Sequence, residues 1–306
     1  MDRLSPRQIN AFQNKILTWY TEHQRNLPWR DIPFDTFLQA RDPYKILLSE
    51  IMLQQTQVSR VIPKYEAWIK AFPTLHDLAK APVSEVLKHW SGLGYNRRAL
   101  NLKKTAQIVD EKYAGKFPQT EKELLALPGI GQYTARAVMC FAFDQQVSVV
   151  DINVKKVILT QLGNESHSKN QELRLGDSSS TIQNENDGTS KNKLTDKEIA
   201  LIADQLLPYG KAYEWNQALM DYASLMLKKE KIDIPKQSTF KGSRRYYRGQ
   251  ILKQLLEKKE IAVNDLDGLI RDEFAVTDDT WLQSLITEMQ DEGFIVVNEK
   301  VIRLAS

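Results

Sequence analysis

Two carboxylates stand in strongly apolar stretches of the chain and could take part in acid–base chemistry. Glu50 lies between Ile46-Leu47-Leu48 and Ile51-Met52-Leu53, so apolar side chains surround it on almost every face of a helix. A helix that is apolar all round is buried, and burial raises the pKa of a carboxyl group, which suits it to act as a general acid. The alternative is a buried structural ion pair with Arg30 or Arg41. The residues alone favour this alternative, because structural networks also perturb pKa values.

The second carboxylate, Asp151, stands in VVDINV (149–154), shortly after a glycine-containing segment. That segment, LPGIGQYTA (127–135), predicts a helix, a tight turn and a new helix. Its glycines, Gly129 and Gly131, let the backbone approach a ligand, and the N–H groups that begin the second helix favour an anion. This arrangement fits a helix-hairpin-helix grip on a DNA phosphate, and an ordinary corner between two helices is the alternative.

Four uncharged polar side chains, Gln54-Gln55-Thr56-Gln57, follow the helix predicted around Glu50. Such side chains could insert among the bases of a nucleic acid. The alternative is that these side chains line a hydrated contact between helices, and the run by itself leaves both interpretations open.

The composition restricts the classes of protein to which the chain can belong. Its 306 residues are 42% apolar and 26% charged, which is ordinary for a soluble globular protein and long enough for two domains. The net charge of +3 permits a nucleic-acid partner only through a local basic surface. The single cysteine, Cys140, excludes a disulfide framework and a thiolate-bound metal site, and the histidines show no metal-ligand spacing. With no apolar run of membrane-spanning length and no signal peptide, we expect a cytoplasmic, metal-free protein.

The elements that must position these residues are helices, because little in residues 1–163 alternates as a strand does. Ser5 with Gln8 forms a capping box that opens a helix through about Tyr20. Asp42-Pro43 opens a second helical segment over 44–62.

Two further helix starts carry the same signal. Thr120 with Glu123 caps a helix over 121–127, and Thr195 with Glu198 caps another. Between them, residues 164–193 nearly lack apolar side chains and cannot bury enough surface to order themselves. We therefore expect a flexible insertion there, inside a domain.

Six sequence blocks occur in a fixed order over most of residues 1–225, and together they are far more specific than any one of them. With them the chain resembles the helix-hairpin-helix DNA glycosylases. The resemblance is closest to the MutY-type adenine DNA glycosylases, which act at A·guanine and A·8-oxoguanine mispairs. The blocks are LPWR (27–30), LLSEIMLQQTQV (47–58), GLGY (92–95), LPGIGQYTARAV (127–138), VDINVKKV (150–157) and WNQALMDY (215–222).

The resemblance implies a mainly α-helical, two-lobed helix-hairpin-helix glycosylase domain over residues 1–235 and a particular pair of carboxylates. Cleavage of an adenine N-glycosidic bond needs a proton on the leaving base and a negative charge beside an oxocarbenium-like sugar. Glu50 matches the acid that protonates adenine at N7, and Asp151 matches the carboxylate that stabilises C1′ of the sugar. Tyr133 and Asn153 match supporting positions that hydrogen-bond around that aspartate. With the resemblance, the structural ion pair becomes the minor interpretation of Glu50.

The resemblance also assigns a pocket for the base, which must leave the stack to be reached. Asp221 could accept a hydrogen bond from the exocyclic N6 amine, which would favour adenine over guanine. Core packing is an equal alternative for Trp29, because tryptophan is highly buried on average. The predicted pocket residues are Arg25, Leu27, Trp29, Arg30 and Asp221.

The predicted DNA contacts lie in the polar run, the GLGY block and the glycine turn. Gln55, Thr56 and Leu93 match the wedge and the contacts to the opposite base. Basic residues after GLGY, including Lys103 and Lys104, could neutralise phosphates, and a solvated basic helix face is the alternative. The predicted DNA-binding residues are Gln55, Thr56, Leu93, Tyr95, Asn96, Arg97, Arg98, Gly129 and Gly131.

Three departures from the family pattern limit what the resemblance implies. The family's 4Fe–4S cluster uses four cysteines after the WNQALMD block, whereas Leu227 stands at the first of those positions and the following residues contain no cysteine. Asn96 stands where the family commonly has a tyrosine. The family's Nudix-like C-terminal domain, which reads 8-oxoguanine, does not fit into the remaining residues. We therefore expect a clusterless enzyme without a cofactor.

The last segment, residues 240–306, predicts a small winged-helix-like α+β domain. Helices are expected over 244–259, 264–270 and 279–290, followed by a hairpin over 294–304. The first helix is basic, whereas the would-be recognition helix is acidic, so base readout by that helix is disfavoured. Docking of the first helix on the DNA backbone, or a contact with a protein partner, is expected instead.

The leading hypothesis is a monofunctional adenine DNA glycosylase of base excision repair. It would be monomeric, bind double-stranded DNA with a mispaired or damaged base, and work in the cytoplasm on the nucleoid. The alternatives are a mismatch thymine/uracil DNA glycosylase on the same scaffold and a catalytically silent lesion-binding protein. The presence of both Glu50 and Asp151 argues against the silent protein.

Overall fold

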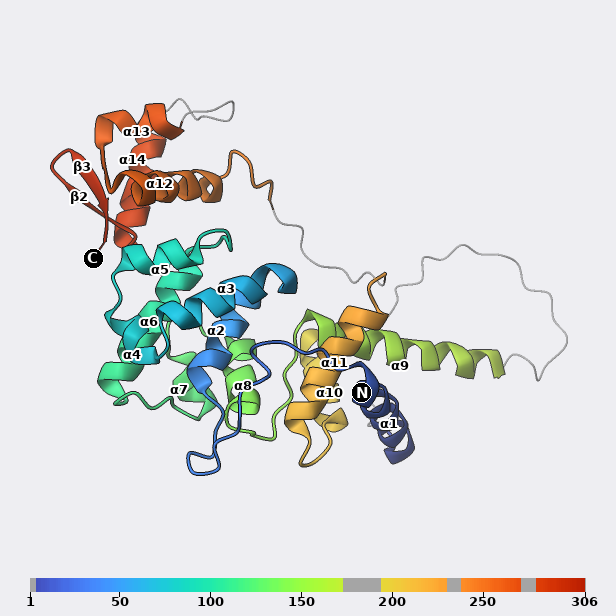
Figure 1. Ribbon diagram of the computed structural model, residues 1–306. Helices are drawn as coiled ribbons and strands as arrows, with labels where there is room; N and C mark the ends of the chain where they lie inside the picture. The colour runs from blue at the N-terminus through green and yellow to red at the C-terminus, as the bar shows by residue number, and fades with distance from the viewer. Residues whose placement is uncertain (1–3, 173–193, 230–237, 271–278, 306) are drawn as a thin grey trace, which may run out of the picture. The chain divides into compact units, whose positions relative to one another are not determined.

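The computed structural model describes residues 4–172, 194–229, 238–270 and 279–305 (Figure 1). Helices dominate this part of the chain, which confirms the mainly α-helical class, and a small sheet lies near its C-terminal end. None of the described helices is both long and apolar enough to span a membrane. The chain forms two compact units. Unit 1 comprises Met1–Asn26, Thr36–Ala40 and Arg136–Asp233, and unit 2 comprises Leu27–Asp35, Arg41–Ala135 and Ile234–Ser306.

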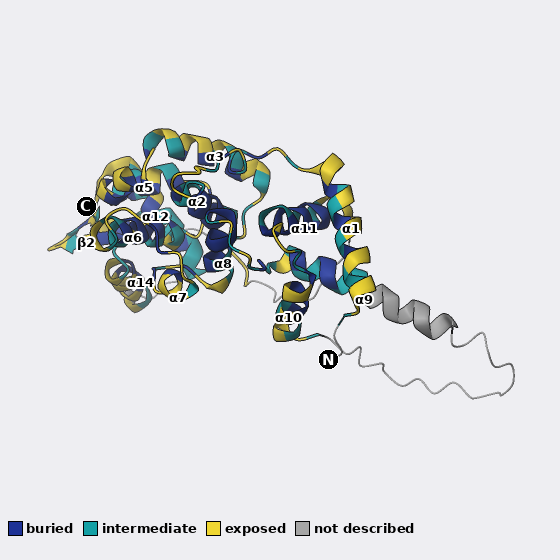
Figure 2. Cartoon of the chain, turned by 90° about the horizontal axis from the view of Figure 1, so that it is seen from below, coloured by how far each residue is buried: buried dark blue, intermediate teal, exposed yellow. Residues whose placement is uncertain are grey.

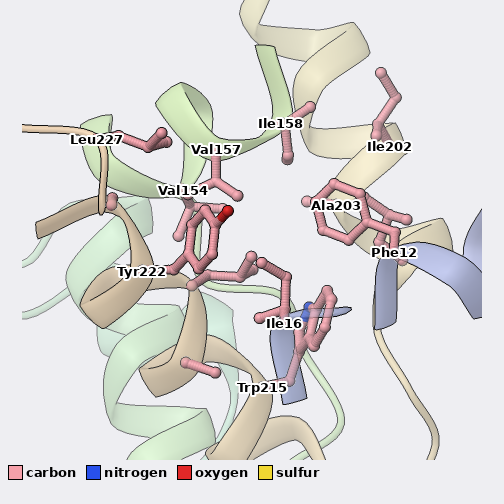
Figure 3. Packing of buried hydrophobic residues seen from close by; sticks show 14 of the residues in the cluster. Phe12, Ile16, Val154, Val157, Ile158, Ile202, Ala203, Trp215, Tyr222 and Leu227 are labelled. Atoms are coloured by element: carbon pink, nitrogen blue, oxygen red, sulfur yellow. The ribbon is translucent and has the colours of Figure 1, made fainter. Parts of the chain in front are cut away.

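Unit 1 contains the first helix of the chain and three later helices, two of which carry the last two sequence blocks. The predicted capping boxes at Ser5 and Thr195 are present, so these two helix starts are confirmed. The apolar faces of the helices meet in one buried cluster, in which Phe12, Trp215 and Tyr222 are the large side chains (Figure 3). The helices are α1 (Pro6–His23), α9 (Ile152–Glu172), α10 (Asp196–Leu206) and α11 (Ala212–Met226).

Helix α9 extends into the segment that the sequence predicts to be flexible. Residues 164–172 belong to this helix, and residues 173–193 lie outside the described residues. A helix already started by a buried first part adds residues at little cost, because each added residue forms one backbone hydrogen bond. The lack of apolar side chains therefore did not end the helix where the composition changes.

The first part of unit 2 holds the helices that carry the remaining blocks. Helix α2 is buried at eight of its eleven residues, and Figure 2 shows it dark blue along most of its length. Asp42 caps it with its side chain, and Thr120 caps α7, as the sequence predicts. The helices are α2 (Pro43–Leu53), α3 (Val58–Ala71), α4 (Leu75–Lys80), α5 (Val83–Trp90), α6 (Arg97–Lys112) and α7 (Glu121–Leu125), and α8 (Gln132–Phe141) begins in unit 2 and ends in unit 1.

The prediction of one helical segment over 44–62 is wrong. Helix α2 ends at Leu53 and α3 begins at Val58, and between them Gln55 takes a left-handed backbone conformation with φ of 56°. A non-glycine residue in that region interrupts a right-handed helix. The apolar pattern on both sides of the turn hid this break from the sequence.

The C-terminal part of unit 2 has the element order predicted for a winged-helix-like domain. The predicted helices and the hairpin are confirmed, and a three-residue strand that was not predicted joins them. The sheet is antiparallel with the last strand in the middle, where Ile302 pairs with Ile261 and Val297. The elements are α12 (Arg244–Lys258), β1 (Glu260–Ala262), α13 (Val263–Ile270), α14 (Asp279–Asp291), β2 (Ile295–Asn298) and β3 (Val301–Leu304).

The C-terminal domain shares a hydrophobic core with α5 and α6, the helices on either side of the GLGY block. Val83 and Leu87 of α5 and Leu100 of α6 belong to the same buried cluster as Leu252 and Phe294. Burial of apolar surface on both sides stabilises this contact. Residues 234–306 accordingly form one compact unit with residues 41–135.

Candidate active site and DNA-binding surface

In unit 2, the buried carboxylate on α2 is held by a tyrosine from the helix that follows the glycine turn. Glu50 is 7% exposed, and the hydroxyl of Tyr133 donates a hydrogen bond of 2.7 Å to its Oε2 atom. Tyr133 is the second residue of α8, so the glycine turn that ends at Gly131 determines where this hydroxyl lies. The sequence predicts that Tyr133 supports Asp151, whereas the hydrogen bond described here goes to Glu50. The arrangement fixes the direction of a carboxylate that could deliver a proton.

Arg98 binds the end of α2 and the two loops that follow α2 and α5. Its Nη1 atom donates to the carbonyl oxygens of Ile51, Met52 and Gln54 at 2.6, 3.2 and 2.7 Å. These include carbonyls that a helix end leaves without an intrahelical partner. Its Nη2 atom donates to the carbonyl oxygens of Leu93 and Gly94, each at 3.1 Å. Burial lowers the pKa of Arg98 to about 10, so the group stays cationic at neutral pH.

Arg98 therefore organises the loops that carry the predicted DNA contacts. Gln55 and Thr56 lie in the turn after α2, and Leu93 lies in the loop after α5. The sequence predicts a phosphate contact for Arg98, and that contact stays a prediction. Because both of its terminal nitrogens already bind the protein, we expect its effect on DNA to pass through the loops. Contacts with backbone carbonyls leave no trace in a sequence, so sequence reasoning missed this function.

The predicted wedge and stacking residues differ in exposure. Leu93 is buried at 4% exposure, so insertion of its side chain into DNA would require the loop to move. Tyr95 is 39% exposed and has a left-handed backbone with φ of 47°. Asn96 follows it and directly precedes α6. Of the three, Tyr95 is the most accessible to a nucleobase.

The basic residues after the GLGY block have separate partners. Lys103 is buried at 7% exposure, its ammonium donates to the carbonyl of Ala79 at 3.1 Å, and burial lowers its pKa. It is therefore no part of an exposed basic surface, and the suggestion that it neutralises a phosphate is wrong. Arg97 donates to the Glu292 carboxylate at 3.3 Å, and Lys104 donates to the carbonyl of the same residue at 3.2 Å. Glu292, which directly follows α14, thus binds two basic residues of α6, a pairing that the sequence left unassigned.

The glycine turn between α7 and α8 is built as the sequence predicts. Gly129 has φ of 77°, and a Cβ atom there would lie 2.8 Å from Cβ of Asn101. Glycine is required at this position for both the backbone conformation and the close packing. Gly131 has open space around it and directly precedes α8. The turn therefore presents backbone N–H groups at a helix N-terminus, which is the geometry that binds a phosphate.

In unit 1, Asp151 caps α9 with its side chain. Oδ1 accepts hydrogen bonds from the backbone N–H groups of Asn153 and Val154, each at 2.8 Å. Oδ2 accepts from Nδ2 of Asn153 at 2.7 Å. Burial raises the pKa of Asp151 above its ordinary value, and these hydrogen bonds oppose that rise because they favour the charged form. Asn153 therefore supports Asp151 in the way predicted for it.

Also in unit 1, the predicted adenine acceptor binds a neighbouring arginine. Asp221 on α11 is fully buried. Its Oδ2 accepts from the backbone N–H of Arg25 at 2.9 Å, and its Oδ1 accepts from Nε of Arg25 at 2.6 Å. A second donor of Arg25, Nη1, contacts Oγ of Ser224 at 3.2 Å. Asp221 thus fixes the position of Arg25, and its contact with a base stays a prediction.

The remaining pocket residues lie in unit 2. Leu27 and Trp29 are both 6% exposed, and the Trp29 ring packs edge-on against Tyr65 with centroids 5.6 Å apart. The N–H of Arg30 donates to the carbonyl of Leu27 at 2.9 Å, which closes a turn over these residues. This packing is that of a core tryptophan. The contact of Trp29 with a base stays a prediction.

The chain does not fit the iron–sulfur cluster that the family resemblance raises. Such a cluster is held by four cysteine thiolates, and the sequence contains only Cys140, which is buried and accepts a 3.3 Å hydrogen bond from Nδ2 of Asn216. Leu227, at the first expected cysteine position, packs in the core of unit 1 (Figure 3). Over the described residues, no group of three or more histidine, cysteine, aspartate or glutamate side chains could hold a metal ion.

Comparison with known proteins gives the family. Residues 48–175 match the model of the HhH-GPD superfamily base excision DNA repair proteins. The chain is 46% identical to the adenine DNA glycosylase of Mycolicibacterium smegmatis over 144 residues, which are 47% of each protein. It is 31% identical to the thymine/uracil-DNA glycosylase of Methanothermobacter thermautotrophicus over 227 residues, which are 74% of this chain and 89% of that protein.

A solved structure agrees with these sequence matches. It is that of a thermostable thymine-DNA glycosylase, with a TM-score of 0.58, 31% identity, and coverage of 73% of this chain and 89% of that one. The chain spans about half or less of the length of the curated adenine DNA glycosylases that it matches first. The match to nearly all of a 31%-identical relative, on the same fold, makes this chain a member of the HhH-GPD superfamily of base excision DNA repair proteins.

Proposed function

We propose that this protein is a monofunctional DNA glycosylase that hydrolyses the N-glycosidic bond of adenine mispaired with guanine or 8-oxoguanine. The observation that carries the proposal is the buried Glu50 carboxylate, held by the hydroxyl of Tyr133 at 2.7 Å. A carboxyl group in that setting is suited to give a proton to a leaving base. Asp151, with both oxygens oriented by Asn153 and the start of α9, supplies the negative charge that the reaction also needs.

In the proposed reaction, Glu50 gives a proton to N7 of adenine while the bond between C1′ and N9 breaks. The bonding electron pair leaves with the base, and the sugar becomes an oxocarbenium-like cation next to the Asp151 carboxylate. Water then adds to C1′, and the proton it loses restores the acid form of Glu50. The products are free adenine and an abasic site in an otherwise intact strand.

Strand cleavage is not part of the proposed activity. Glycosylases that also nick the strand use a lysine amine to form a Schiff base with C1′. In the endonuclease III relatives that lysine occupies the position held here by Tyr133. We expect borohydride to trap no covalent complex with DNA, and trapping at high yield would contradict the proposal.

A thymine/uracil DNA glycosylase is the second candidate. It is favoured by the match that covers 89% of such an enzyme at 31% identity, whereas the adenine-specific match reaches 46% identity over a shorter region. Asp221 supports adenine, because a carboxylate oxygen can accept a hydrogen bond from the exocyclic amine of that base, whereas the arginine bound to it can only donate.

The test is single-turnover base release from four duplexes that contain A·8-oxoguanine, A·guanine, T·guanine or U·guanine. Release of adenine alone is the expected result. Release of thymine or uracil would establish the second candidate. Release of no base from any duplex would indicate a lesion-binding protein without catalysis.

We further propose that the enzyme works without a 4Fe–4S cluster, on double-stranded DNA, as a monomer on the cytoplasmic nucleoid. The single cysteine and the apolar packing of Leu227 support the first point. An iron and sulfide assay on the purified protein, with a visible absorption spectrum, would test it. We expect no iron in stoichiometric amount.

A further inference from the structure

A cavity of about 620 Å³ lies within unit 2 where the C-terminal domain meets the loop after the GLGY block. Its volume is within the range of sites that bind small molecules. One wall comes from Gln55, Tyr95 and Asn96, and the other comes from Phe240, Arg245 and Arg248. Nothing in the proposed mechanism uses this cavity.

The lining combines exposed aromatic rings with a guanidinium. Tyr95 is 39% exposed and Phe240 is 59% exposed. Arg245 donates to the hydroxyl of Tyr95 at 2.8 Å, and its guanidinium carbon lies 5.5 Å from the centroid of that ring. Arginine and aromatic side chains together are what proteins use to hold a nucleobase and its phosphate.

Two acidic residues at the end of α14 and just after it pair with arginines other than Arg245. Glu292 binds Arg97 and Arg248, and Glu288 binds Arg244. The described partners of Arg245 are all neutral: the Tyr95 hydroxyl and the carbonyl and hydroxyl oxygens of Ser238. Its positive charge is therefore available to attract an anion at the cavity. This also explains why this region can be acidic in a protein that binds DNA, since Glu288 binds α12 and Glu292 binds both α12 and α6.

We propose that this cavity binds one nucleotide of the DNA substrate, with the base against Tyr95 and Phe240 and the phosphate toward Arg245. Gln55 and Asn96, which are predicted DNA contacts, line the cavity, so a DNA strand that contacts them lies at its opening. The C-terminal domain then acts as a second wall of the DNA-binding surface. This inference rests on the proposed function only in taking DNA as the ligand.

The experiment measures binding to a duplex whose target adenosine carries a 2′-fluorine, which slows cleavage of the glycosidic bond. Each nucleotide near the mispair, in both strands, is replaced in turn by an abasic residue. With the wild-type protein, the affinity is expected to fall about fivefold or more at one position, which identifies the nucleotide that enters the cavity. In Arg245→Ala and Phe240→Ala, overall affinity falls and that position loses its effect.

Arg244→Ala is the matched control. Arg244 neighbours Arg245 on α12 but pairs with Glu288 and does not line the cavity. Arg244→Ala should therefore leave unchanged the abasic profile, which is the affinity measured with the abasic residue at each position in turn. The proposal would be overturned if no position lowered the affinity when made abasic. It would also be overturned if such a sensitive position persisted in Arg245→Ala. Binding of free nucleoside monophosphate with no sensitive position in DNA would overturn it as well.

The proposed function fails differently. In that case unmodified duplexes release no adenine with the wild-type protein, whatever the abasic profile shows. The two results are therefore independent. Thermal unfolding of Arg245→Ala should match that of Arg244→Ala, because both side chains are half-buried on the first turn of α12 and both form hydrogen bonds at the surface.

Discussion

The hydroxyl of Tyr133 lies 2.7 Å from the carboxylate of Glu50, although the two residues are 83 positions apart in the chain. Tyr133 begins the helix after the glycine turn, and Glu50 stands on the most deeply buried helix of unit 2. The turn predicted to hold a DNA phosphate and the acid predicted to protonate the base are therefore directly connected.

Tyr133→Phe should lower single-turnover base release by about tenfold to a hundredfold, because it removes the group that orients Glu50, and a positioned acid contributes at least that much. Stability should change by only about 1 kcal/mol, the value of one hydrogen bond. Tyr113→Phe is the control, since Tyr113 follows α6 and takes no part in the site. Equal rates in the two variants would show that Glu50 does not depend on Tyr133.

Asp151→Asn should abolish base release and leave binding to the mispaired duplex nearly unchanged. Asparagine keeps an oxygen that can cap α9, but it lacks the charge that stabilises the sugar cation. The thermal midpoint at pH 7 should rise, because burial raises the pKa of Asp151 and its ionised form therefore costs stability. Asp196→Asn, at an 87% exposed side chain in the same unit, should show normal release and no stabilisation. Near-normal turnover in Asp151→Asn would refute the assigned chemistry.

As the pH is lowered, the rate of base release should begin to fall at a higher pH than it would if Asp151 had the pKa of an ordinary aspartate. Asp151 must be ionised to act, and burial raises its pKa above the usual 3.8. The same rise in pKa also determines the direction in which the free energy of unfolding changes with pH. Because the pKa of Asp151 is higher in the folded than in the unfolded protein, its protonated form stabilises the fold. This stabilisation is complete below the unfolded-state pKa and is lost as the pH rises through the folded-state pKa. The stability advantage of Asp151→Asn should thus shrink as the pH is lowered. A rate that stays constant down to pH 3.8 would exclude Asp151 as the titrating group.

Arg98→Met should destabilise the protein by about 2–4 kcal/mol, because it leaves several buried carbonyl oxygens without donors. Arg97→Met should cost less than about 1 kcal/mol, since Arg97 is exposed and holds a surface ion pair. Urea unfolding of both variants measures the difference. At temperatures where Arg98→Met remains folded, its affinity for mispaired duplex should fall because the loops with Gln55 and Leu93 lose their common anchor. Equal stability of the two variants would show that Arg98 does not hold the loops.

Asn96→Tyr should increase the preference for adenine opposite 8-oxoguanine over adenine opposite guanine. The family commonly has an aromatic ring at this position, and base stacking on a ring contributes about 1–3 kcal/mol. We expect the wild-type protein to remove adenine opposite both purines with only a small preference. Single-turnover rates and duplex affinities on the two substrates measure it. A strong preference already present in the wild type would point instead to the C-terminal domain as the part that reads the opposite base.

Local features of the structure could be predicted from the sequence because each depends on residues within one helical turn. The side chains of Ser5, Asp42 and Thr195 cap their helices as predicted, and Gly129 takes the conformation that only glycine adopts readily. The burial of Glu50 likewise follows from the apolar residues on either side of it. In each case the interaction is set by neighbours three or four positions away.

The sequence by itself determined which residue types are present, where several of the helices begin and that the chain cannot hold a four-cysteine cluster. Only the tertiary structure decided their partners: Tyr133 for Glu50, Arg25 for Asp221, and the carbonyls of two separate loops for Arg98. It also decided that Glu292, directly after α14, binds Arg97. These contacts join residues far apart in the chain, and a hydrogen bond or ion pair across such a distance forms only after the burial of apolar faces has packed the helices. A sequence records which groups can pair, whereas the packing of the helices selects the pairs that form.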